Sequence, residues 1–381
     1  MRILVLNAGS SSLKVALVVD GRSVERRSVD WGFDATRARD RAATVRHVLA
    51  DPGLAGVQPP DAVGHRIVHG GGEFREAVAV DDRIAERLRA LEPMAPLHNP
   101  VAIDVLETAR TTLPGTPHVA TFDTAFHRTL PEAARRYPVP NRWGDWGVRR
   151  YGFHGLSVEW ATERAAALIG RPIEALRIVV AHLGSGCSVT AVDRGRSVAT
   201  SMGMTPAEGL MMGTRAGSID PGILIRLLRD GRLTLDELAE DLEHRSGLIG
   251  IAGTSDVAAL EDRATRGDGA AELALEMFTG RAAAGIAAAA TALPALDAIV
   301  FTGGIGENAV ATRARIVDRL SVLGIGRLGP AGESGQESAE AVLSRPNAPI
   351  AVLRVEAREE LVIARHAQAV LEPLGLGGRP P

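Results

Sequence analysis

The feature that most constrains the fold of this chain is a segment that occurs twice. Residues 2–24 read RILVLNAGSSSLKVALVVDGRSV, and residues 177–198 read RIVVAHLGSGCSVTAVDRGRSV. In each copy an arginine opens an apolar run of strand length, followed by a polar residue, a Gly/Ser turn, a second apolar run and a hairpin. The polar residue is Asn7 in the first copy and His182 in the second. A duplicated domain is the simplest explanation of this repeat.

The rest of the chain alternates predicted strands and helices. Asn99 followed by Pro100 predicts a helix start, because asparagine caps helices and proline suits the first turn. The longest apolar stretch, 282–301, is mostly alanine and is interrupted by Pro294 and Asp297, so it indicates a buried helix and a strand, not a membrane span. A mixed α/β fold in two related domains is therefore expected. The expected strands are 62–68, 119–122, 299–302 and 349–355, and the expected helices include 81–91 and 361–371.

Composition excludes several classes of protein. A chain of 381 residues with 45% hydrophobic and 23% charged residues is typical of a soluble protein of about two domains. The net charge of −3 gives no electrostatic basis for a nucleic-acid partner. Cys187 is the only cysteine, which excludes an intrachain disulfide and favours a reducing compartment. The apolar run 3–6 is too short for a signal peptide, so we expect a cytoplasmic protein.

Three glycine-rich turns, at 7–12, 184–186 and 303–306, each follow a predicted strand. Glycines allow the backbone to approach a phosphate and to direct N–H groups at its oxygens. A single turn of this kind is usually only a tight turn, but three in a duplicated chain favour a nucleotide held between the domains. None matches the G-x-x-x-x-G-K-[ST] pattern, and no G-x-G-x-x-G follows a strand, so P-loop and Rossmann folds are disfavoured.

A series of motifs in this order resembles the acetate kinase family and covers nearly the whole chain. They read NAGSSSLK (7–14), GHRIVHGG (64–71), PLHNP (96–100), FDTAFH (122–127), RRYGFHG (149–155), SMGMTPAEGLMMGTRAGSIDPGI (201–223), GGIGEN (303–308) and EELVIAR (359–365). The resemblance implies two duplicated ribonuclease-H-like domains of the actin-like ATPase fold, with nucleotide and substrate in the cleft between them. It implies an N-terminal domain of residues 1–126 closed by the C-terminal helix at 360–381, and a nucleotide-binding and dimerisation domain of residues 127–359.

The activity that this resemblance implies is reversible, Mg²⁺-dependent transfer of the ATP γ-phosphoryl group to acetate, giving acetyl phosphate and ADP by in-line displacement. Mn²⁺ is the alternative metal, and a homodimer with no membrane or nucleic-acid partner is expected. Acetate is ionised at pH 7 and needs no general base. The difficulty is the approach of one anion to another, so catalysis requires neutralisation of charge and positioning.

The motif positions imply a role for each charged site residue. Arg66 matches the arginine that binds the carboxylate, which its planar fork suits. Arg215 and His154 match the pair that stabilises the phosphoryl group in flight. Asp123 matches an aspartate that positions substrate or a magnesium-bound water. The remaining charged or polar positions are Asn7 and Glu359, associated with magnesium, and Lys14, which binds nucleotide phosphate and is the only lysine of the chain.

Two further sets of residues follow from the same motifs. The nucleotide-binding set is His182, Leu183, Gly184, Ser185, Gly186, Asp256, Gly303, Gly304, Ile305, Gly306 and Glu307. The pocket around the acyl methyl group is Val68, Leu97, Phe153 and Pro206. These types suit acetate, and because one methylene changes binding by only about 1–3 kcal/mol, propionate should be accepted less efficiently.

Each of these residues also has a purely structural interpretation. A lone arginine such as Arg66 is usually solvated or salt-bridged, and His154 could be a packed core histidine. Glu359 could simply favour the dipole of a helix N-terminus. The ten histidines show no H-E-x-x-H or compact Cys/His spacing that would indicate zinc. The motif context favours the functional interpretation for Arg66, Asp123, His154 and Arg215.

Three departures from the family pattern raise the question of the phosphoryl donor. Ser185 replaces the usual asparagine, Ala258 stands where a D-x-R element has arginine, and Leu156 and Val158 replace residues of G-T-S-H. One hypothesis is altered donor binding, with pyrophosphate or another nucleotide accepted; the simpler one is a divergent ATP enzyme. The alternatives for the whole protein are a propionate- or butyrate-preferring kinase, an actin- or heat-shock-like ATPase that acts on a partner, and a non-catalytic family member.

Overall fold

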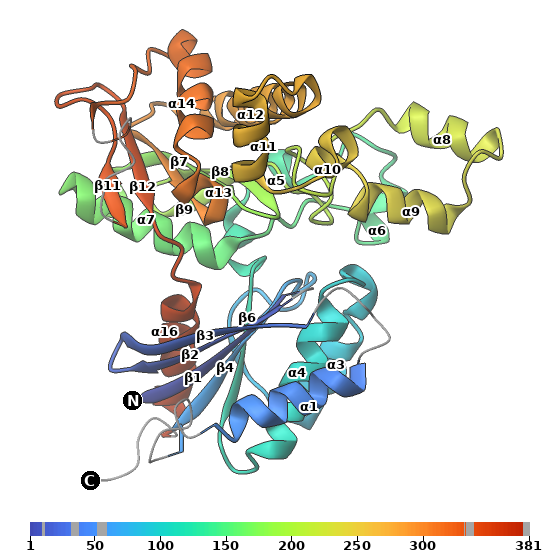
Figure 1. The fold of residues 1–381 in the computed structure, drawn as a ribbon. Coiled ribbons are helices and arrows are strands. Elements are labelled where there is room, and N and C mark those ends of the chain that lie inside the picture. The colour runs from blue at the N-terminus through green and yellow to red at the C-terminus, as the bar shows by residue number, and fades with distance from the viewer. Residues whose placement is uncertain (10–11, 32–37, 52–58, 331, 333–338, 376–381) are drawn as a thin grey trace. The chain divides into compact units, whose positions relative to one another are not determined.

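The computed structural model describes residues 1–9, 12–31, 38–51, 59–330, 332 and 339–375. The chain divides into two compact units (Figure 1). Unit 1 comprises Met1–Arg128 and Arg358–Pro381, and unit 2 comprises Thr129–Ala357. Each unit is built around one six-stranded mixed sheet with helices, which confirms the predicted α/β fold.

Unit 1 contains the first half of the strands and the C-terminal helix. Its strands are β1 (Arg2–Ala8), β2 (Ser12–Val19), β3 (Arg22–Asp30), β4 (Ala62–Ile67), β5 (Val78–Ala79) and β6 (His118–Phe122). Its α-helices are α1 (Ala38–Leu49), α3 (Asp82–Arg89), α4 (Asn99–Thr112) and α16 (Glu359–Leu371).

Unit 2 contains the second half of the strands and most of the helices. Its strands are β7 (Arg177–Leu183), β8 (Cys187–Asp193), β9 (Arg196–Thr200), β10 (Ala298–Thr302), β11 (Glu340–Val342) and β12 (Ala351–Val355). Its α-helices are α5 (Glu132–Arg135), α6 (Arg142–Asp145), α7 (Gly155–Ile169), α8 (Pro221–Arg229), α9 (Leu235–His244), α10 (Gly247–Ala252), α11 (Val257–Thr265), α12 (Gly269–Ala290), α13 (Gly303–Asn308) and α14 (Val310–Arg319).

The two sheets have the same topology. The strand orders are β3-β2-β1-β4-β6-β5 in unit 1 and β9-β8-β7-β10-β12-β11 in unit 2. In both, the first three strands are antiparallel neighbours, the next two pairings are parallel, and the last edge strand is antiparallel. Even the register irregularity is repeated, between Leu17 and Val18 in unit 1 and between Ala191 and Val192 in unit 2. The structure therefore confirms the duplication predicted from the sequence repeat.

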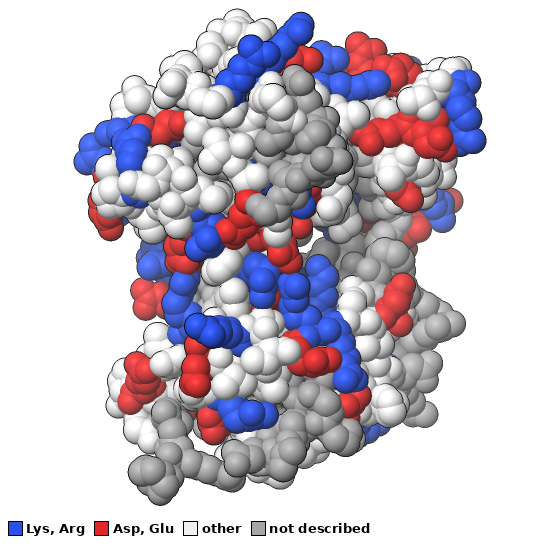
Figure 2. All heavy atoms as spheres, turned by 60° about the vertical axis from the view of Figure 1, so that its left-hand side comes forward, with Lys and Arg blue, Asp and Glu red and all other residues white. Residues whose placement is uncertain are grey.

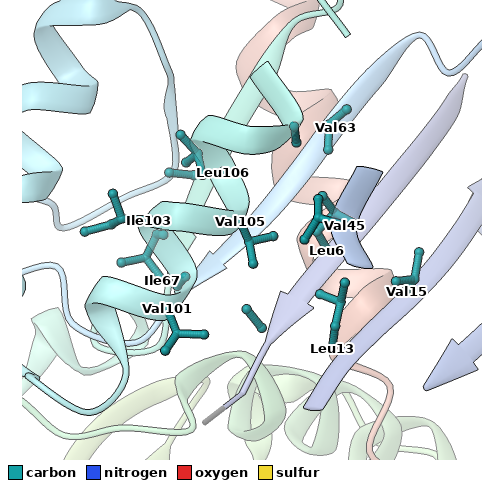
Figure 3. Packing of buried hydrophobic residues seen from close by; sticks show 14 of the residues in the cluster. Leu6, Leu13, Val15, Val45, Val63, Ile67, Val101, Ile103, Val105 and Leu106 are labelled. Atoms are coloured by element: carbon teal, nitrogen blue, oxygen red, sulfur yellow. The ribbon is translucent and has the colours of Figure 1, made fainter. Parts of the chain in front are cut away.

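The core of unit 1 lies between its sheet and helices α1 and α4 (Figure 3). Leu6, Val63 and Ile67 of the sheet pack with Val105 and Leu106 of α4. Successive residues of a strand face opposite sides, and Gly64, next to Val63, faces α16: a Cβ atom there would lie 2.7 Å from Ile363. The sheet is thus covered on both faces, and α16 fixes the position of its own first residue, Glu359, beside the central strands.

One predicted detail of this unit is wrong. Asn99 does not cap α4; it is the first residue of that helix, and His98 occupies the cap position without a side-chain hydrogen bond. The Asn99 side chain is instead fully buried and bonded to backbone atoms of His69 and Leu91. The demand of a buried turn for hydrogen-bond partners has overridden the local capping preference.

Helix α12 of unit 2 accounts for the long apolar stretch. Among the described residues, one helix, α12, is long and apolar enough to cross a membrane by length and composition alone. Nine of its residues, including Phe278 and Ile286, are buried, and the helix packs on β7, β8, α10, α11 and α14. It is followed by β10, so the interpretation as a buried helix and then a strand is confirmed.

Figure 2 shows acidic and basic side chains interspersed over the face that it draws, in keeping with their near-equal numbers of 46 and 43.

Candidate functional site

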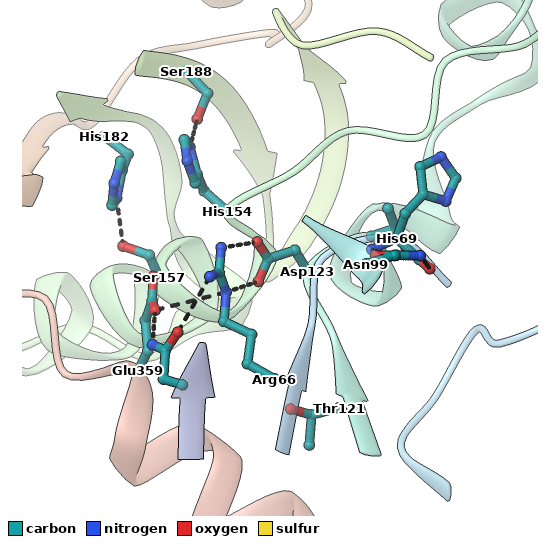
Figure 4. Close-up of polar contacts among 12 residues, drawn as sticks. Arg66, His69, Asn99, Thr121, Asp123, His154, Ser157, His182, Ser188 and Glu359 are labelled. Carbon is teal, nitrogen blue, oxygen red and sulfur yellow. Dashed lines mark hydrogen bonds and ion pairs between the residues drawn. The ribbon is translucent and has the colours of Figure 1, made fainter. Parts of the chain in front are cut away.

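The central strands of the unit 1 sheet bring three predicted site residues together. Strands β1, β4 and β6 are parallel, so their carboxyl ends meet at one edge of the sheet. Asn7 lies near the end of β1, Arg66 near the end of β4, and Asp123 directly after β6. Glu359 joins them from the start of α16 (Figure 4).

Hydrogen bonds connect these four side chains into one network, which we call the unit 1 polar cluster. Arg66 donates from Nε to Oδ1 of Asp123 over 2.9 Å and from Nη2 to Oδ2 over 2.5 Å. Arg66 Nη1 donates to Oδ1 of Asn7 at 3.2 Å, and Asn7 Nδ2 donates to Oε2 of Glu359 at 2.7 Å. The fork of Arg66 is therefore held by Asp123 in the bidentate geometry that arginine and carboxylate favour.

The electrostatics of this cluster follow from its burial. The Arg66 side chain is 13% exposed, Asp123 is 0% exposed and Glu359 is 16% exposed. Burial alone would lower the pKa of Arg66, but the charges of Asp123 and Glu359 raise it above its usual range. One guanidinium and two carboxylates leave the cluster with a net charge of −1, which favours an added cation.

The donor set of the cluster fits Mg²⁺. This ion binds through one or two carboxylates and completes its shell with water and substrate phosphate oxygens. Among the residues that the structure describes, no group of three His, Cys, Asp or Glu side chains could hold a metal ion by itself. The carboxylate of Glu359 and the amide oxygen of Asn7 are the hard oxygen donors that a partly hydrated Mg²⁺ requires.

The neighbouring HGG turn is held by a residue that the sequence did not mark as functional. Asn99 accepts from the backbone N–H of His69 at 3.0 Å and donates to its carbonyl at 3.0 Å. This pairing fixes the backbone directly after Val68, which is buried, and near Leu97, which is half-buried. Two hydrogen bonds between one side chain and the backbone of one distant residue cannot be predicted from sequence, although the place of Asn99 within the PLHNP motif was a signal.

Lys14 lies across from Asn7 in the β1–β2 pairing and is exposed. The turn that joins these strands was predicted to contact phosphate. Ser10 and Ser11 of that turn lie outside the described residues.

In unit 2, two predicted residues stack on each other. The rings of His154 and His182 lie 4.1 Å apart between centroids, with 25° between their planes. His154 Nδ1 is 3.0 Å from the Ser188 hydroxyl oxygen, and His182 Nδ1 is 2.8 Å from that of Ser157 (Figure 4). His154 has a left-handed backbone, with φ of 58°, directly before α7. Two serines that the sequence analysis did not single out therefore fix both imidazoles through Nδ1.

Arg215 lies close to the same imidazole. A Cβ atom at Gly186 would lie 3.3 Å from His154 Nε2 and 3.8 Å from Arg215 Nη1, so glycine allows both side chains to approach this turn. Arg215 is 13% exposed, and its Nε lies 3.1 Å from Oε2 of Glu243, a partner that the sequence analysis missed.

Two of the glycine-rich turns come together in unit 2. Gly303 has φ of 77°, and a Cβ atom on it would lie 2.8 Å from the Leu183 carbonyl oxygen and 3.1 Å from His182 Nε2. Gly184 approaches the backbone nitrogen of Gly304. The segments 182–186 and 303–306 thus form one surface of closely packed backbone, which can direct N–H groups at an anion.

The remaining predicted nucleotide contacts have mixed environments. The Leu183 side chain is fully buried, so only its backbone can reach a ligand. Glu307 accepts from the N–H of Ala357 at 3.0 Å, and burial raises its pKa. Asp256 caps α11 by accepting from two backbone N–H groups, next to Ser255, which contacts Gly213. Ile305 is half-buried, whereas Ser185 is exposed and its carbonyl accepts from Gly213.

Two of the departures from the family pattern, Leu156 and Val158, have a structural explanation. Leu156 and Val158 are buried, so they contribute to the core of unit 2, and Ser157 between them keeps its bond to His182. Arg263 donates to Asp268 and to the Ala252 carbonyl. Its neighbour in sequence, Arg266, pairs with Asp262. Both guanidinium groups that follow Ala258 on this helix and its end are thus engaged with acidic side chains of unit 2.

The structure thus collects the predicted residues into two sets. Asn7, Arg66, Asp123 and Glu359 form one network in unit 1, and His154, His182, Gly186 and Arg215 are neighbours in unit 2. The four acyl-pocket residues are divided between the units: Val68 and Leu97 belong to unit 1, Phe153 and Pro206 to unit 2.

Comparison with known proteins identifies the family to which these residues belong. The model of the acetokinase family matches residues 34–365. This chain belongs to the acetokinase family. The resemblance carried by the motifs is confirmed over nearly its full length.

Acetate kinases from several organisms align over nearly the whole chain. The acetate kinase of Deinococcus deserti is 44% identical over 97% of this chain and 98% of its own. That of Thermotoga maritima is 38% identical, over 98% of this chain and all of its own. Two solved structures superpose with a TM-score of 0.85 at 34% identity: the Porphyromonas gingivalis acetate kinase, over 97% of this chain and 99% of that one, and a propionate kinase of Francisella tularensis, over 96% and 98%.

Proposed function

We propose that this protein is an acetate kinase, which transfers the γ-phosphoryl group of ATP to acetate and forms acetyl phosphate and ADP reversibly. Membership of the acetokinase family supports a kinase with a carboxylate acceptor. The observation that carries the proposal is the unit 1 polar cluster: the four residues that the motifs assign to acceptor and metal form one hydrogen-bonded network.

Arg66 is proposed to bind the acetate carboxylate. Nε and Nη2 of Arg66 donate to Asp123, and Nη1 donates to Asn7. Nη1 is therefore the nitrogen from which we expect Arg66 to bind the substrate carboxylate. Asp123 orients Arg66 in this account. Both of its oxygens accept from the guanidinium, and acetate has no proton to lose at neutral pH, so no base is needed.

His154 and Arg215 are proposed to stabilise the phosphoryl group in transfer. Charge on the equatorial oxygens of that group calls for preorganised donors. Ser188 lies 3.0 Å from Nδ1 of His154, and Nε2 lies beside Gly186, which the Arg215 guanidinium also approaches. Glu243 forms an ion pair with Arg215 at Nε, and Nη1 donates to the Pro206 carbonyl at 3.5 Å, so the Nη edge faces the loop of the proposed acyl pocket.

ATP is proposed to bind at the glycine turns of unit 2 and through Lys14 of unit 1, with unit 2 as the nucleotide-binding domain. Asn7 and Glu359 are the proposed protein contacts of Mg²⁺, for which Mn²⁺ is the alternative. When bound, the metal neutralises phosphate charge and fixes the orientation of the triphosphate. The remaining nucleotide contacts are those of the turns 182–186 and 303–307 together with Asp256.

We also propose a cytoplasmic homodimer with no membrane or nucleic-acid partner. The exposed apolar side chains of unit 2 support self-association: Ile223, Ile225 and Leu228 are exposed on α8, and Leu235 at the start of α9 is 71% exposed. Cys187 is buried, and burial raises its pKa to about 12, as suits an unreactive thiol.

The proposed activity can be tested directly. Purified protein is incubated with acetate, Mg²⁺ and ATP, and acetyl phosphate is trapped as its hydroxamate, with Arg215→Ala as a control. Acetate-dependent hydroxamate that collapses in the variant is the expected result. A protein that binds ATP but forms no acyl hydroxamate from acetate, propionate or butyrate would contradict the proposal and favour a switch-like ATPase.

Two finer points need their own panels. The propionate kinase among the similar structures makes a preference for propionate the second candidate, and relative kcat/KM across chain lengths decides between them. A donor panel of ATP, other nucleotides and pyrophosphate tests the hypothesis raised by Ser185 and Ala258. If only ATP is productive, the unusual-donor hypothesis is wrong.

A further inference from the structure

A second polar network in unit 2 surrounds the loop that carries Pro206. Tyr137 donates its hydroxyl proton to Oε2 of Glu208 and accepts from the backbone N–H of Met204 over 3.0 Å. Met204 and Glu208 lie two residues before and two residues after Pro206. One phenol oxygen therefore closes the loop at both ends, and Pro206 forms its tip.

Arg150 ties this loop to the segment that contains Phe153 and His154. It donates from Nη2 to Oε1 of Glu208 at 2.7 Å. From Nη1 it donates to the carbonyls of Ser201 and Met202, at 2.9 Å each. Its guanidinium carbon also lies 5.2 Å from the centre of the Tyr137 ring, in cation–π geometry.

The backbone repeats this connection. Gly203 directs its carbonyl at the N–H groups of Tyr151 and Gly152, at 3.0 and 3.3 Å, directly before Phe153. A Cβ atom on Gly203 would clash with the Tyr137 hydroxyl and the Glu208 carboxylate, so the network closes only over glycine. Both segments that carry the proposed unit 2 pocket residues, Phe153 and Pro206, are thus fixed to the same three side chains.

The Tyr137 hydroxyl stays protonated at neutral pH. Burial, and then the hydrogen bond to Glu208, raise the pKa of Tyr137 to about 12, so its hydroxyl stays a proton donor. The side chains are half-buried, with Arg150 18% and Glu208 32% exposed, and three hydrogen bonds of Arg150 hold it in one position. A loop held in this way has a defined shape before substrate arrives, as selectivity for a small acyl group requires.

We propose that Tyr137 and Glu208 are positioning residues that hold Pro206 against the acyl group and thereby set the chain length that the enzyme accepts. The inference rests on the proposed function. It adds that selectivity for acetate depends on Tyr137 and Glu208, which we call the brace residues, as well as on the residues that line the pocket. Loss of the brace should allow Pro206 to withdraw, which benefits propionate more than acetate.

The test compares kcat/KM for propionate and acetate in the wild type, Tyr137→Phe and Glu208→Gln. Tyr137→Phe keeps the ring over Arg150 and removes both bonds of the hydroxyl. We expect the propionate-to-acetate ratio to rise about fivefold in Tyr137→Phe, since one methylene is worth at most a moderate change in binding. Glu208→Gln should raise the ratio less, because its single amide oxygen can still accept from Tyr137 or from Arg150, so one of the two bonds of Glu208 is kept.

The matched control is Glu340→Gln, which breaks a different ion pair of unit 2, that of Glu340 with Arg164. Its ratio should equal that of the wild type. Hydrogen exchange of peptides covering 203–208 should be faster in Tyr137→Phe than in the wild type and unchanged in Glu340→Gln. In the double variant Tyr137→Phe/Glu208→Gln, the change in the propionate-to-acetate ratio should be smaller than the two single changes combined, because the two brace residues act through one contact.

The outcomes separate this inference from the proposed function. If the wild type phosphorylates no carboxylate, the proposed function is wrong and the inference falls with it. If the wild type phosphorylates acetate but Tyr137→Phe lowers kcat/KM for both substrates equally, the brace is merely structural and the inference alone is wrong. A ratio that rises equally in Glu340→Gln would also contradict it.

Discussion

The two sheets have one topology, but the ends of their central strands carry different chemistry. Ile3 pairs with Ala62 in unit 1, and Ile178 pairs with Ala298 in unit 2. Continuing this register and that of the next strand pair makes Asn7 equivalent to His182, Arg66 to Thr302, and Asp123 to Ala357. Unit 1 therefore presents a charged network where unit 2 presents a histidine, a threonine and an alanine, the first two followed by glycine turns.

In the proposed function, this difference assigns a separate task to each of the two duplicated units. An anionic acceptor and a divalent cation need charged side chains, which unit 1 supplies at its strand ends. A nucleotide needs close backbone approach, which the glycines of unit 2 permit. Arg215, the proposed catalytic cation, comes from the segment between β9 and α8 rather than from a strand end.

The largest expected effect is loss of catalysis when the Arg215 guanidinium is removed. Arg215→Ala should lower kcat by about 10³-fold or more, because an arginine on the transferred phosphoryl group contributes that much in comparable reactions. The measurement is steady-state hydroxamate formation. Arg315→Ala, on the exposed surface of α14, is the control and should retain full activity. A drop in kcat of less than tenfold for Arg215→Ala would remove that residue from the chemistry.

The free energy of unfolding should depend more on Arg66 of unit 1 than on Arg215 of unit 2. Arg66→Ala leaves Asp123 buried without its ion-pair partner and should lower the free energy of unfolding by about 3 kcal/mol. Arg215→Ala leaves Glu243, which is 28% exposed, and should cost about 1 kcal/mol or less. Urea unfolding of both variants gives the comparison. Equal losses would show that the unit 1 polar cluster is not the more tightly held of the two.

A glycine substitution should affect unit 2 through backbone geometry. Gly303→Ala introduces a Cβ atom 2.8 Å from the Leu183 carbonyl and strains a φ of 77°. The KM for ATP should rise about tenfold, which corresponds to the 1–2 kcal/mol cost of that conformation. Gly267→Ala is the matched control, with φ of 86° and open space around it. A normal KM for ATP in Gly303→Ala would exclude this turn from the nucleotide site.

The smallest expected effect concerns acid stability, again confined to unit 1. His65 Nε2 lies 2.9 Å from His118 Nδ1 in the core, where the equivalent residues of unit 2 are Phe301 and Val352. Burial lowers the pKa of both histidines, that of His118 to about 4. The folded protein keeps them neutral while the unfolded chain protonates near pH 6.5. Stability is therefore full above that pH and is lost as the pH falls towards 4.

We expect the wild type to lose at least about 1 kcal/mol of unfolding free energy between pH 7 and pH 5.5 through this pair. His118→Val places at this position the residue type that its unit 2 equivalent, Val352, has. This variant should lose less unfolding free energy between pH 7 and pH 5.5 than the wild type, whatever its stability at pH 7. Chemical denaturation at the two pH values provides the test. An unchanged slope in the variant would assign the acid sensitivity to other groups.

Much of this architecture could be predicted from the sequence. The repeat at 2–24 and 177–198 indicated the duplication because the strand–turn–strand pattern is local, and the glycine turns marked the edge where the strands end. The edge strands β5 and β11 were not predicted, because their two and three residues carry no periodic signal. Asn99 was assigned to the wrong partner because a capping preference is local, whereas its bonds join residues 30 positions apart.

The site residues were identified by motif, but their pairing was not. Nothing in the sequence indicates that Arg66 places its fork on Asp123, or that Ser157 and Ser188 hold the two histidines. Such contacts join strand ends or loops that are brought together only by the sheet, so they depend on register rather than on spacing. Glu243, which holds Arg215, was missed for the same reason.

The most direct test of the division of tasks is a crossed measurement of both KM values. KM for acetate and KM for ATP are determined for the wild type, Arg66→Lys and Gly303→Ala in the hydroxamate assay. Lysine keeps the charge of Arg66 and loses its fork. The account predicts that Arg66→Lys raises the KM for acetate and leaves that for ATP within about twofold, and that Gly303→Ala does the reverse. Variants that raise both KM values by the same factor would contradict it.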